Sequence, residues 1–392
     1  MRMKRFARQI VVGSATGMSD AKMSQNKYTV IPFGPQHPVL PEPVHLRFIV
    51  DEDKIVDVVP NLGYVHRGIE RGCELNDYKR NIYLCERVCG ICNYIHGMTY
   101  SEAIEKVTDT EVPIRAKYLR VIWSELGRLQ SHLLWLGLFA DAVGFESLFM
   151  QIWRDREIIL TLNEKTNGHR IHLETNLIGG CRKDIDESLA KAYVEDLSVV
   201  RKKIEDLRPV FYKDSALKSK CEGKGILPKD KASFLGAVGP TIRGSGIKQD
   251  TRMTGYEAYG ALDFEPIVYN GEDAYSRMLV RYDEVFLSFD LIDKALKEMP
   301  KGIVFNKNTK FPDGTAIARS EQARGELFYY VEGNGTNKLN RCKIRTPTAA
   351  NIPPLVSMLI GNEISDIPTI IHSIDPCISC TERFVQVKKE AD

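Results

Sequence analysis

The sequence lacks several features that define whole classes of protein. No stretch approaches the roughly 20 uninterrupted apolar residues of a membrane-spanning helix, so we expect any membrane association to depend on partner subunits. Cysteine is scarce, at nine in 392 residues. Because an odd number of thiols cannot pair completely, this composition argues against a disulfide scaffold and favours thiols in a reducing cytoplasm. The net charge of only +2 excludes strong electrostatic steering toward nucleic acid.

The amino-terminal segment does not look like a secretion signal. Its longest apolar run before Gly13 is Ile10-Val11-Val12, which is too short for the hydrophobic region of a signal peptide. We expect residues 1–27 to form a mobile lead-in. Hydrophobic residues make up 43% and charged residues 27% of the chain, as in ordinary globular proteins, and the length allows two or more packed lobes.

Short β-rich segments and long helical patterns alternate along the chain. Residues 28–33, 44–50 and 55–60 are rich in β-branched and aromatic side chains and predict a small antiparallel sheet. Pro113 fits the first turn of a long helix whose second half is apolar on nearly every side, which is typical of a central, packed helix. Further helices are predicted at 147–166, 185–207, 272–298 and 352–361, and strands at 327–333 and 343–348.

These patterns predict an α+β fold, mostly α, with a central bundle of long helices and small peripheral antiparallel sheets. We expect one domain at 28–383, followed by a tail at 384–392. Within the domain we expect a β region at 28–76, a helical core at 77–210 and 272–300, a loop-rich insertion at 211–271, and a carboxy-terminal α/β region at 301–383.

Two Cys-x-x-Cys pairs lie at opposite ends of the chain, Cys89 with Cys92 and Cys377 with Cys380. Local zinc motifs close over roughly 15–20 residues, whereas these pairs are separated by most of the chain. A site that joins them therefore lies inside a large domain. Thiolates are soft donors that select zinc, iron–sulfur, nickel or copper. From the spacing alone, a structural zinc site, or one redox pair beside an unrelated one, stays open.

The flanking residues are more specific than the spacing. Residues 86–97 read ERVCGICNYIHG and residues 375–383 read DPCISCTER, and both resemble the signatures of nickel–iron hydrogenase large subunits. Residues 131–170 and the loop GPQHPVLPEP at 34–43 resemble the membrane-bound, energy-converting branch, which is homologous to the 49-kDa subunit of respiratory complex I. The resemblance extends from about residue 28 to residue 383. The complex I relatives have lost the four cysteines that are present here.

The resemblance implies a ligand set for a nickel–iron centre. Cys89 and Cys377 would be terminal ligands of nickel, and Cys92 and Cys380 would bridge nickel and iron. The family's iron carries carbon monoxide and cyanide ligands, and buried cyanide anions need hydrogen-bond donors.

Two further motifs match the donors that the family places beside the iron. They lie at 323–325 and 346–348 and nominate Arg324 and Thr348. Without the resemblance, a surface arginine and a strand hydroxyl would be the expected interpretations. Asp141 on the long helix is expected to be buried and to pair with Arg324.

The resemblance also implies a route for protons. The family splits dihydrogen into a hydride and a proton, with the thiolate of Cys377 as the first base and Glu42 as the gateway carboxylate. A solvated loop residue is the alternative for Glu42. His37 matches a quinone-contacting histidine of complex I, and here it would lie on a water-filled path or cap a turn. His96, in the first cysteine motif, is expected next to the centre without ligating it.

Glu70 matches a carboxylate that holds magnesium or iron in soluble relatives. Those relatives have a histidine where this chain has Arg383, which argues against a divalent ion and suggests a Glu70–Arg383 ion pair. His132 is expected to be a buried histidine with a satisfied hydrogen bond. The remaining cysteines are expected to be packing residues; they are Cys73, Cys85, Cys181, Cys221 and Cys342. The residues after Arg383 would be either a cleaved extension or a permanent tail.

The chain contains no iron–sulfur motif of the C-x-x-C-x-x-C-x-x-x-C type. Electrons would therefore arrive through a small iron–sulfur subunit, with ferredoxin as donor and ion-translocating membrane subunits beneath. The sequence predicts the catalytic subunit of an energy-converting nickel–iron hydrogenase, peripheral on the cytoplasmic face of the membrane. The alternatives are a complex I-like subunit that forms a quinone or other substrate cavity without nickel chemistry, and a structural zinc scaffold.

Overall fold

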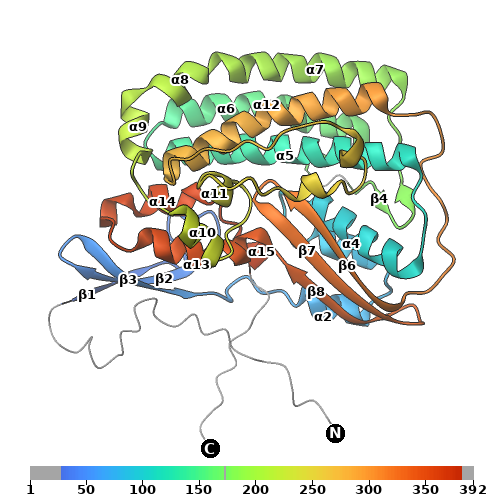
Figure 1. Cartoon of the computed structure of the whole chain (residues 1–392), viewed down its shortest axis with the longest axis horizontal. Coiled ribbons are helices and arrows are strands. Elements are labelled where there is room, and N and C mark those ends of the chain that lie inside the picture. The colour runs from blue at the N-terminus through green and yellow to red at the C-terminus, as the bar shows by residue number, and fades with distance from the viewer. Residues whose placement is uncertain (1–27, 172–173, 382–392) are drawn as a thin grey trace, which may run out of the picture.

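The structure is a computed structural model that describes residues 28–171 and 174–381. Long helices form one layer, and two small three-stranded antiparallel sheets lie beneath them at the periphery (Figure 1). The predicted α+β, mostly α, class is confirmed. The buried apolar side chains divide into two clusters, one between and beneath the long helices and one between the first sheet and the carboxy-terminal helices.

The first sheet contains β1 (Thr29–Phe33), β2 (His45–Asp51) and β3 (Lys54–Asn61), paired in that order. These are the three strands predicted from β-branched and aromatic content. Phe48 and Val58 pair across β2 and β3 and are fully buried, because alternate side chains of a strand point to the same face. The loop between β1 and β2 carries His37 and Glu42.

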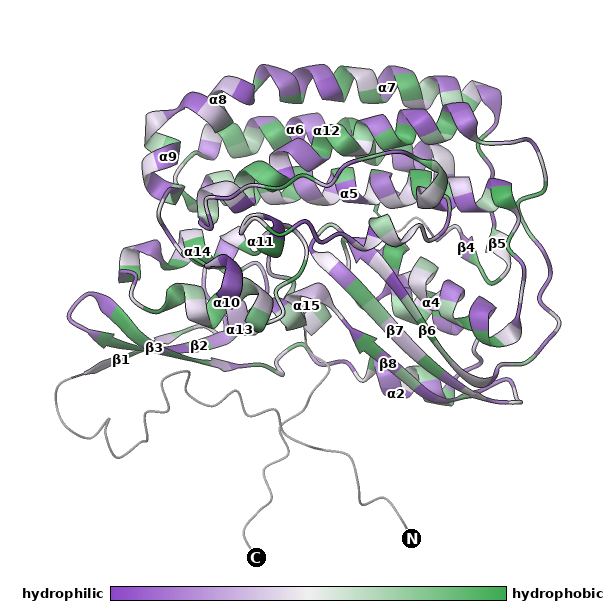
Figure 2. Ribbon diagram, in the orientation of Figure 1, coloured by the Kyte–Doolittle hydropathy of each residue, from purple (hydrophilic) through white to green (hydrophobic). Residues whose placement is uncertain are grey.

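The helical layer is built from α5 (Ile114–Ala142), α6 (Glu146–Asn167), α7 (Glu187–Asp206) and α12 (Ala274–Glu298). Pro113 is the residue before the first turn of α5, and α6 ends at Gly168 in the left-handed conformation with φ 81°. Helix α5 is buried on nearly every side, as predicted, because α6 and α12 pack against it. Helix α7 is amphipathic, with alternating polar and apolar bands in Figure 2.

The second large sheet contains β6 (Asp313–Gln322), β7 (Gly325–Asn334) and β8 (Leu339–Arg345). The sequence predicted β7 and β8 but not β6, whose exposed first half has little apolar alternation. Helix α4 (Asn93–Thr108) packs against β6 and β7, and α2 (Ile69–Leu75) packs against β8. The turn between β6 and β7 carries Arg324.

Two boundaries differ from the predictions. Helices begin before residue 77, since α2 starts at Ile69 and α3 (Asn81–Glu86) follows it. The segment expected to be loop-rich contains short helices, because Pro and Gly there start and end single turns. These are α8 (Arg208–Lys213), α9 (Ser215–Cys221), α10 (Lys229–Phe234), α11 (Pro240–Arg243), η1 (Thr251–Thr254) and η2 (Tyr259–Ala261), and a two-stranded pair precedes them at β4 (Asn176–Leu177) and β5 (Gly180–Cys181).

The carboxy-terminal region adds α13 (Pro347–Leu359), η3 (Ile364–Asp366), α14 (Ile367–Ser373) and α15 (Ile378–Thr381). Helix α13 begins earlier than predicted, so that Thr348 lies in its first turn rather than on a strand. Helix α15 lies against α13 near the ends of both sheets (Figure 1). Within the described ranges, no helix combines the length and the apolar character needed to cross a bilayer.

Candidate metal centre

Two short segments bring the cysteine pairs together. Cys89 lies in the turn after α3, and Cys92 is the residue before the first turn of α4. Cys377 immediately precedes α15, and Cys380 lies within it. All four side chains are at most 4% exposed, so the folded chain gathers both pairs into one interior pocket.

The sulfur atoms lie within a few ångströms of one another. Cys89 Sγ is 3.6 Å from Cys377 Sγ, Cys92 Sγ is 3.8 Å from Cys380 Sγ, and Cys377 Sγ is 3.0 Å from Cys380 Sγ. Two ligands of one metal with metal–sulfur bonds of about 2.3 Å are separated by about 3.8 Å at tetrahedral angles. The spacing and the all-sulfur donor set therefore fit a thiophilic metal centre.

The local backbone and charges favour one thiolate even without a cation. The backbone amides of Ile91 and Cys92 donate to Cys89 Sγ over 3.3 and 3.2 Å. Burial opposes ionisation, but hydrogen bonds from the Cys377, Cys380 and Cys92 thiols hold the pKa of Cys89 well below its usual value. Metal cations deprotonate their thiol ligands, and a metal would therefore supply the charge that the other three thiols need.

Arg324 reaches the pocket from the β6–β7 turn and is 2% exposed. Its Nε donates to the carbonyl oxygen of Asp375 over 2.9 Å, and its Nη2 donates to Asp375 Oδ1 over 2.8 Å. Burial opposes the charge of the guanidinium, yet Asp375 and the neighbouring thiol of Cys377 hold its pKa well above the usual value. The structure therefore places a buried guanidinium next to the cysteines.

The predicted partner of Arg324 is wrong. Asp141 lies near the carboxy-terminal end of α5 and is exposed, because the apolar face of that helix ends before it. Asp375, two residues before Cys377, is 4% exposed and forms the ion pair instead. Asp375 is the first residue of the motif at 375–383, so its closeness to Cys377 in the sequence was the signal that could have identified it as the partner of Arg324.

Hydroxyl groups hold the distal cysteine segment. Thr348 Oγ1 accepts a hydrogen bond from the backbone amide of Cys377 over 3.2 Å, which leaves its own proton available to donate. Thr346 Oγ1 donates to the carbonyl oxygen of Cys380 over 2.7 Å. Thr381 Oγ1 donates to the carbonyl oxygen of Cys377 over 2.9 Å. The structure thus places Thr348 beside the pocket.

His96 lies one helical turn after Cys92, with its Nε2 3.9 Å from Cys380 Sγ. Its Nδ1 is 2.8 Å from Tyr329 Oη, and Gln322 Nε2 is 3.1 Å from its Nε2. Both ring nitrogens therefore have polar partners on the β6–β7 sheet, which fixes the imidazole against the cysteines. His96 therefore lies beside the sulfur of Cys380.

Glu42 reaches the segment between the two distal cysteines. Its Oε2 accepts from the backbone amide of Ser379 over 3.0 Å, and its Oε1 accepts from Ser379 Oγ. His37 stacks on Phe33 and accepts from the Val39 amide over 3.2 Å. A shallow surface depression is lined by the loop from Pro35 to Pro43, which contains both His37 and Glu42. Glu42 therefore lies between the pocket wall and the surface.

Sequence reasoning missed Arg67, whose guanidinium joins the two cysteine segments. It donates to the carbonyl oxygens of Arg87 and Val88 over 2.7 and 2.8 Å, and to that of Ser379 over 3.3 Å. An exposed arginine in a loop gives no signal for such a role, because the contacts depend on carbonyl groups that are remote in the chain.

Glu70 is bound to cations of the chain itself. Its carboxylate accepts from Arg341 Nη2 over 2.8 Å, from Lys343 Nζ over 3.1 Å and from the Ile344 amide over 3.0 Å. Arg383, its expected ion-pair partner, lies outside the described residues, as do the lead-in and the tail. The expectation for His132 is confirmed, since the buried imidazole lies 2.8 Å from Glu284 Oε2.

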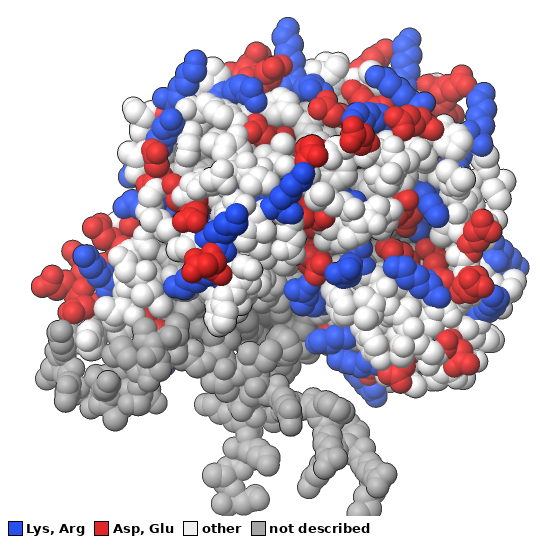
Figure 3. Space-filling model, in the orientation of Figure 1, with Lys and Arg blue, Asp and Glu red and all other residues white. Residues whose placement is uncertain are grey.

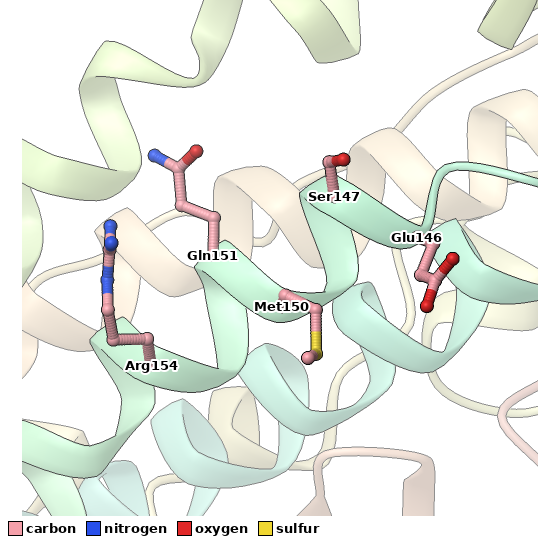
Figure 4. Close-up of a pocket in the computed structure, with 5 residues that line it drawn as sticks. All are labelled: Glu146, Ser147, Met150, Gln151 and Arg154. Carbon is pink, nitrogen blue, oxygen red and sulfur yellow. The ribbon is translucent and has the colours of Figure 1, made fainter.

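Other surface features lie apart from this centre. A depression on α6 is lined by polar side chains and Met150, with no thiol or imidazole (Figure 4); the lining residues are Glu146, Ser147, Met150, Gln151 and Arg154. Charges of both signs are interspersed over the described face in Figure 3.

Comparison with known proteins decides the family. The model for the 49-kDa subunit of respiratory-chain NADH dehydrogenase matches residues 142–311 and 303–383, and the model for nickel-dependent hydrogenase matches residues 67–139. Membrane-bound hydrogenase subunit alpha of Pyrococcus furiosus is 38% identical over 386 residues, covering 94% of this chain and 90% of that protein. The chain belongs to the nickel–iron hydrogenase large-subunit family, in its membrane-bound, energy-converting branch.

Further relatives agree with this hydrogenase-family assignment. The carbon monoxide-induced hydrogenase of Rhodospirillum rubrum is 40% identical over 356 residues, covering 90% of this chain and 99% of that protein. A solved chain from the membrane-bound sulfane sulfur reductase, an archaeal respiratory membrane complex, superposes with a TM-score of 0.87 at 28% identity, covering 92% of this chain and all of that chain. The family is one of oxidoreductase subunits within multisubunit membrane complexes.

Proposed function

We propose that this chain is the catalytic subunit of an energy-converting nickel–iron hydrogenase, which reversibly reduces protons to dihydrogen. The observation that carries the proposal is the gathering of four buried thiols from opposite ends of the chain into one pocket. Electrons would come from reduced ferredoxin through a small iron–sulfur subunit. Membrane subunits would couple the reaction to ion translocation, with this chain peripheral on the cytoplasmic face.

The four cysteines would hold the metals. Cys89, Cys92, Cys377 and Cys380 would together hold nickel and iron. When bound, such a centre supplies the place where dihydrogen is formed or split. The separation of 3.0–3.8 Å between paired sulfurs supports shared coordination.

Arg324 and Thr348 would orient the iron's anionic ligands. A guanidinium has five N–H donors, and the hydrogen bonds from Arg324 to Asp375 and Ser131 use three of them. Remaining donors are thus available for a buried anion, which needs such partners. Asp375 keeps the guanidinium charged and fixes its plane.

Protons would leave the pocket through Cys377 and Glu42. Glu42 binds Ser379, which lies between Cys377 and Cys380 in the chain, so Glu42 could take up a proton released by the thiol of Cys377. Glu42 lies in the loop that lines the surface depression, so it can exchange protons with solvent. General acid–base groups of this kind contribute about 10²–10⁴-fold to rate.

Metal analysis and infrared spectroscopy of the intact, anaerobically purified complex test the proposal. We expect nickel and iron bound to this subunit, with infrared bands from diatomic ligands, and hydrogen evolution driven by reduced ferredoxin. Thiols without nickel would instead support a complex I-like subunit with a quinone or other substrate cavity. Zinc alone in the pocket would support a structural scaffold.

The proton route has its own test. Glu42→Gln keeps the shape and the acceptor oxygen but removes the carboxylate, so we expect hydrogen evolution to fall by about 10²-fold or more while the infrared bands persist. Glu52→Gln is the control, because Glu52 is exposed in the β2–β3 turn. Equal activity of both variants would remove Glu42 from the route.

A further inference from the structure

Three other cysteines form a second cluster of thiols. Cys73 lies on α2, Cys85 on α3 and Cys342 on β8, and each is fully buried. Their Sγ atoms all lie within 4.8 Å of one another, and Cys73 Sγ is 3.8 Å from Cys85 Sγ. Their spacing in the sequence matches no motif and predicts only packing residues. The fold brings three thiols from three elements to one point.

The geometry of the cluster is that of a ligand set. A disulfide holds its sulfurs about 2.05 Å apart, so a separation of 3.8 Å is that of two thiols. Two thiolates on one zinc ion, with bonds of about 2.3 Å, are about 3.8 Å apart at tetrahedral angles and about 4.0 Å apart in a trigonal arrangement. A single ion at the centre would therefore reach all three sulfurs with little movement of the backbone.

We propose that Cys73, Cys85 and Cys342 bind one thiophilic d¹⁰ metal ion, zinc(II) or copper(I), at a structural site distinct from the nickel–iron centre. Among the described residues, no histidine or carboxylate joins the three sulfurs within ligand spacing. An all-sulfur donor set favours soft ions over magnesium, calcium or manganese. The inference is independent of the proposed hydrogenase activity.

Metal ions deprotonate the thiols that bind them. Hydrogen bonds from the Cys342 and Cys85 thiols lower the pKa of Cys73 to about 5. Burial raises the pKa of Cys85 well above its usual value, and a metal that binds there displaces the remaining protons.

The position of the cluster explains what an ion would stabilise. Helix α3 ends at Glu86, and its chain continues directly to Cys89 of the hydrogenase centre. Strand β8 pairs with β7, which begins next to Arg324. An ion bound by Cys85 and Cys342 would tie the helix that leads to the proximal cysteines to the sheet that presents the arginine. This role is a positioning one, since the site does not touch the reacting atoms.

The ion pairs around the cluster support the same arrangement. Arg341 and Lys343 flank Cys342 on β8 and bind Glu70 of α2, while Arg341 also binds Glu74 over 2.7 Å. These contacts hold α2 against β8 from outside, and the thiols face one another inside. A metal ion bound by the three thiols would hold α2 and β8 together from the interior side as well.

The test is metal analysis of the intact complex, with X-ray absorption at the zinc and copper edges. We expect one zinc or copper per large subunit beyond nickel and iron, with three sulfur neighbours at about 2.3 Å. Cys73→Ser and Cys342→Ser should lose this metal, with nickel retained in at least one of them. Cys221→Ser, which changes another buried cysteine outside the cluster, should keep it.

Several results would overturn the inference. One is the absence of zinc and copper in the wild-type complex. Another is an equal content of zinc and copper in Cys73→Ser and Cys221→Ser. A third is a disulfide among the three cysteines, seen as a mass 2 Da lower before reduction. The absorption measurement on the wild type needs no variant, so a variant that fails to fold does not remove the test.

Discussion

Asp375 is predicted to stabilise the folded protein by pairing with the buried Arg324 beside the cysteine pocket. Asp375→Ala removes the carboxylate that pairs with Arg324 over 2.8 Å, while the bond from Arg324 Nε to the backbone carbonyl of residue 375 can persist. Both side chains are at most 6% exposed, so the remaining charge stays desolvated. Breaking a buried pair from one side costs about 3–5 kcal/mol, and the retained bond places the expected loss near 3 kcal/mol.

Thermal unfolding of the purified subunit or complex measures this loss. With an unfolding entropy of roughly 2.1 cal/mol/K per residue, 3 kcal/mol corresponds to a decrease in Tm of about 4 °C for a cooperative chain of this length. Asp141→Ala is the matched control, because Asp141 is exposed and surface substitutions usually change stability by less than about 0.5 kcal/mol. Equal Tm values for the two variants would refute the assignment of the ion pair.

Two further predictions concern α3, the helix that precedes Cys89, and the turn that carries Arg324. Burial raises the pKa of Glu86 to about 8, so between about pH 5 and 8 the unfolded chain releases a proton that the folded chain keeps. Stability should fall by up to about 1.4 kcal/mol per pH unit, and Glu86→Gln should flatten this slope in urea unfolding; an unchanged slope contradicts it. In Gly239→Ala, the new Cβ would lie 2.3 Å from the carbonyl oxygen of Arg324, so we expect the free energy of unfolding to fall by about 1–3 kcal/mol and hydrogen evolution to decrease. Gly236→Ala is the control, because Gly236 has a similar φ of 67° and nothing lies within 4 Å of its added Cβ, so this variant should keep its activity. Equal activity of the two variants would contradict the prediction.

The sequence predicted what depends on local pattern or on short motifs. The first sheet, the central helix from residue 114 and the last strands follow from side-chain periodicity, and the structure contains them. The four cysteines were paired in the prediction by their flanking residues, and the fold places them in one pocket. Both kinds of signal lie in consecutive residues, so a single sequence is sufficient to predict these elements and the cysteine pairing.

The remainder depends on contacts between distant segments. Asp141 looked buried because the helix before it is apolar, but the burial of a helix end depends on what packs over it, and Asp375 pairs with Arg324 instead. The cluster of Cys73, Cys85 and Cys342 has no motif because three elements contribute one residue each. Arg67 binds backbone carbonyl groups, which carry no side-chain signature.

The central claim is that the four gathered thiols hold nickel. X-ray absorption at the nickel edge of the intact complex tests it most directly, with Cys377→Ser measured alongside. We predict four sulfur neighbours around one nickel per large subunit, and loss of nickel in Cys377→Ser. A wild-type complex without nickel, or with nickel surrounded mainly by nitrogen and oxygen, would contradict the account.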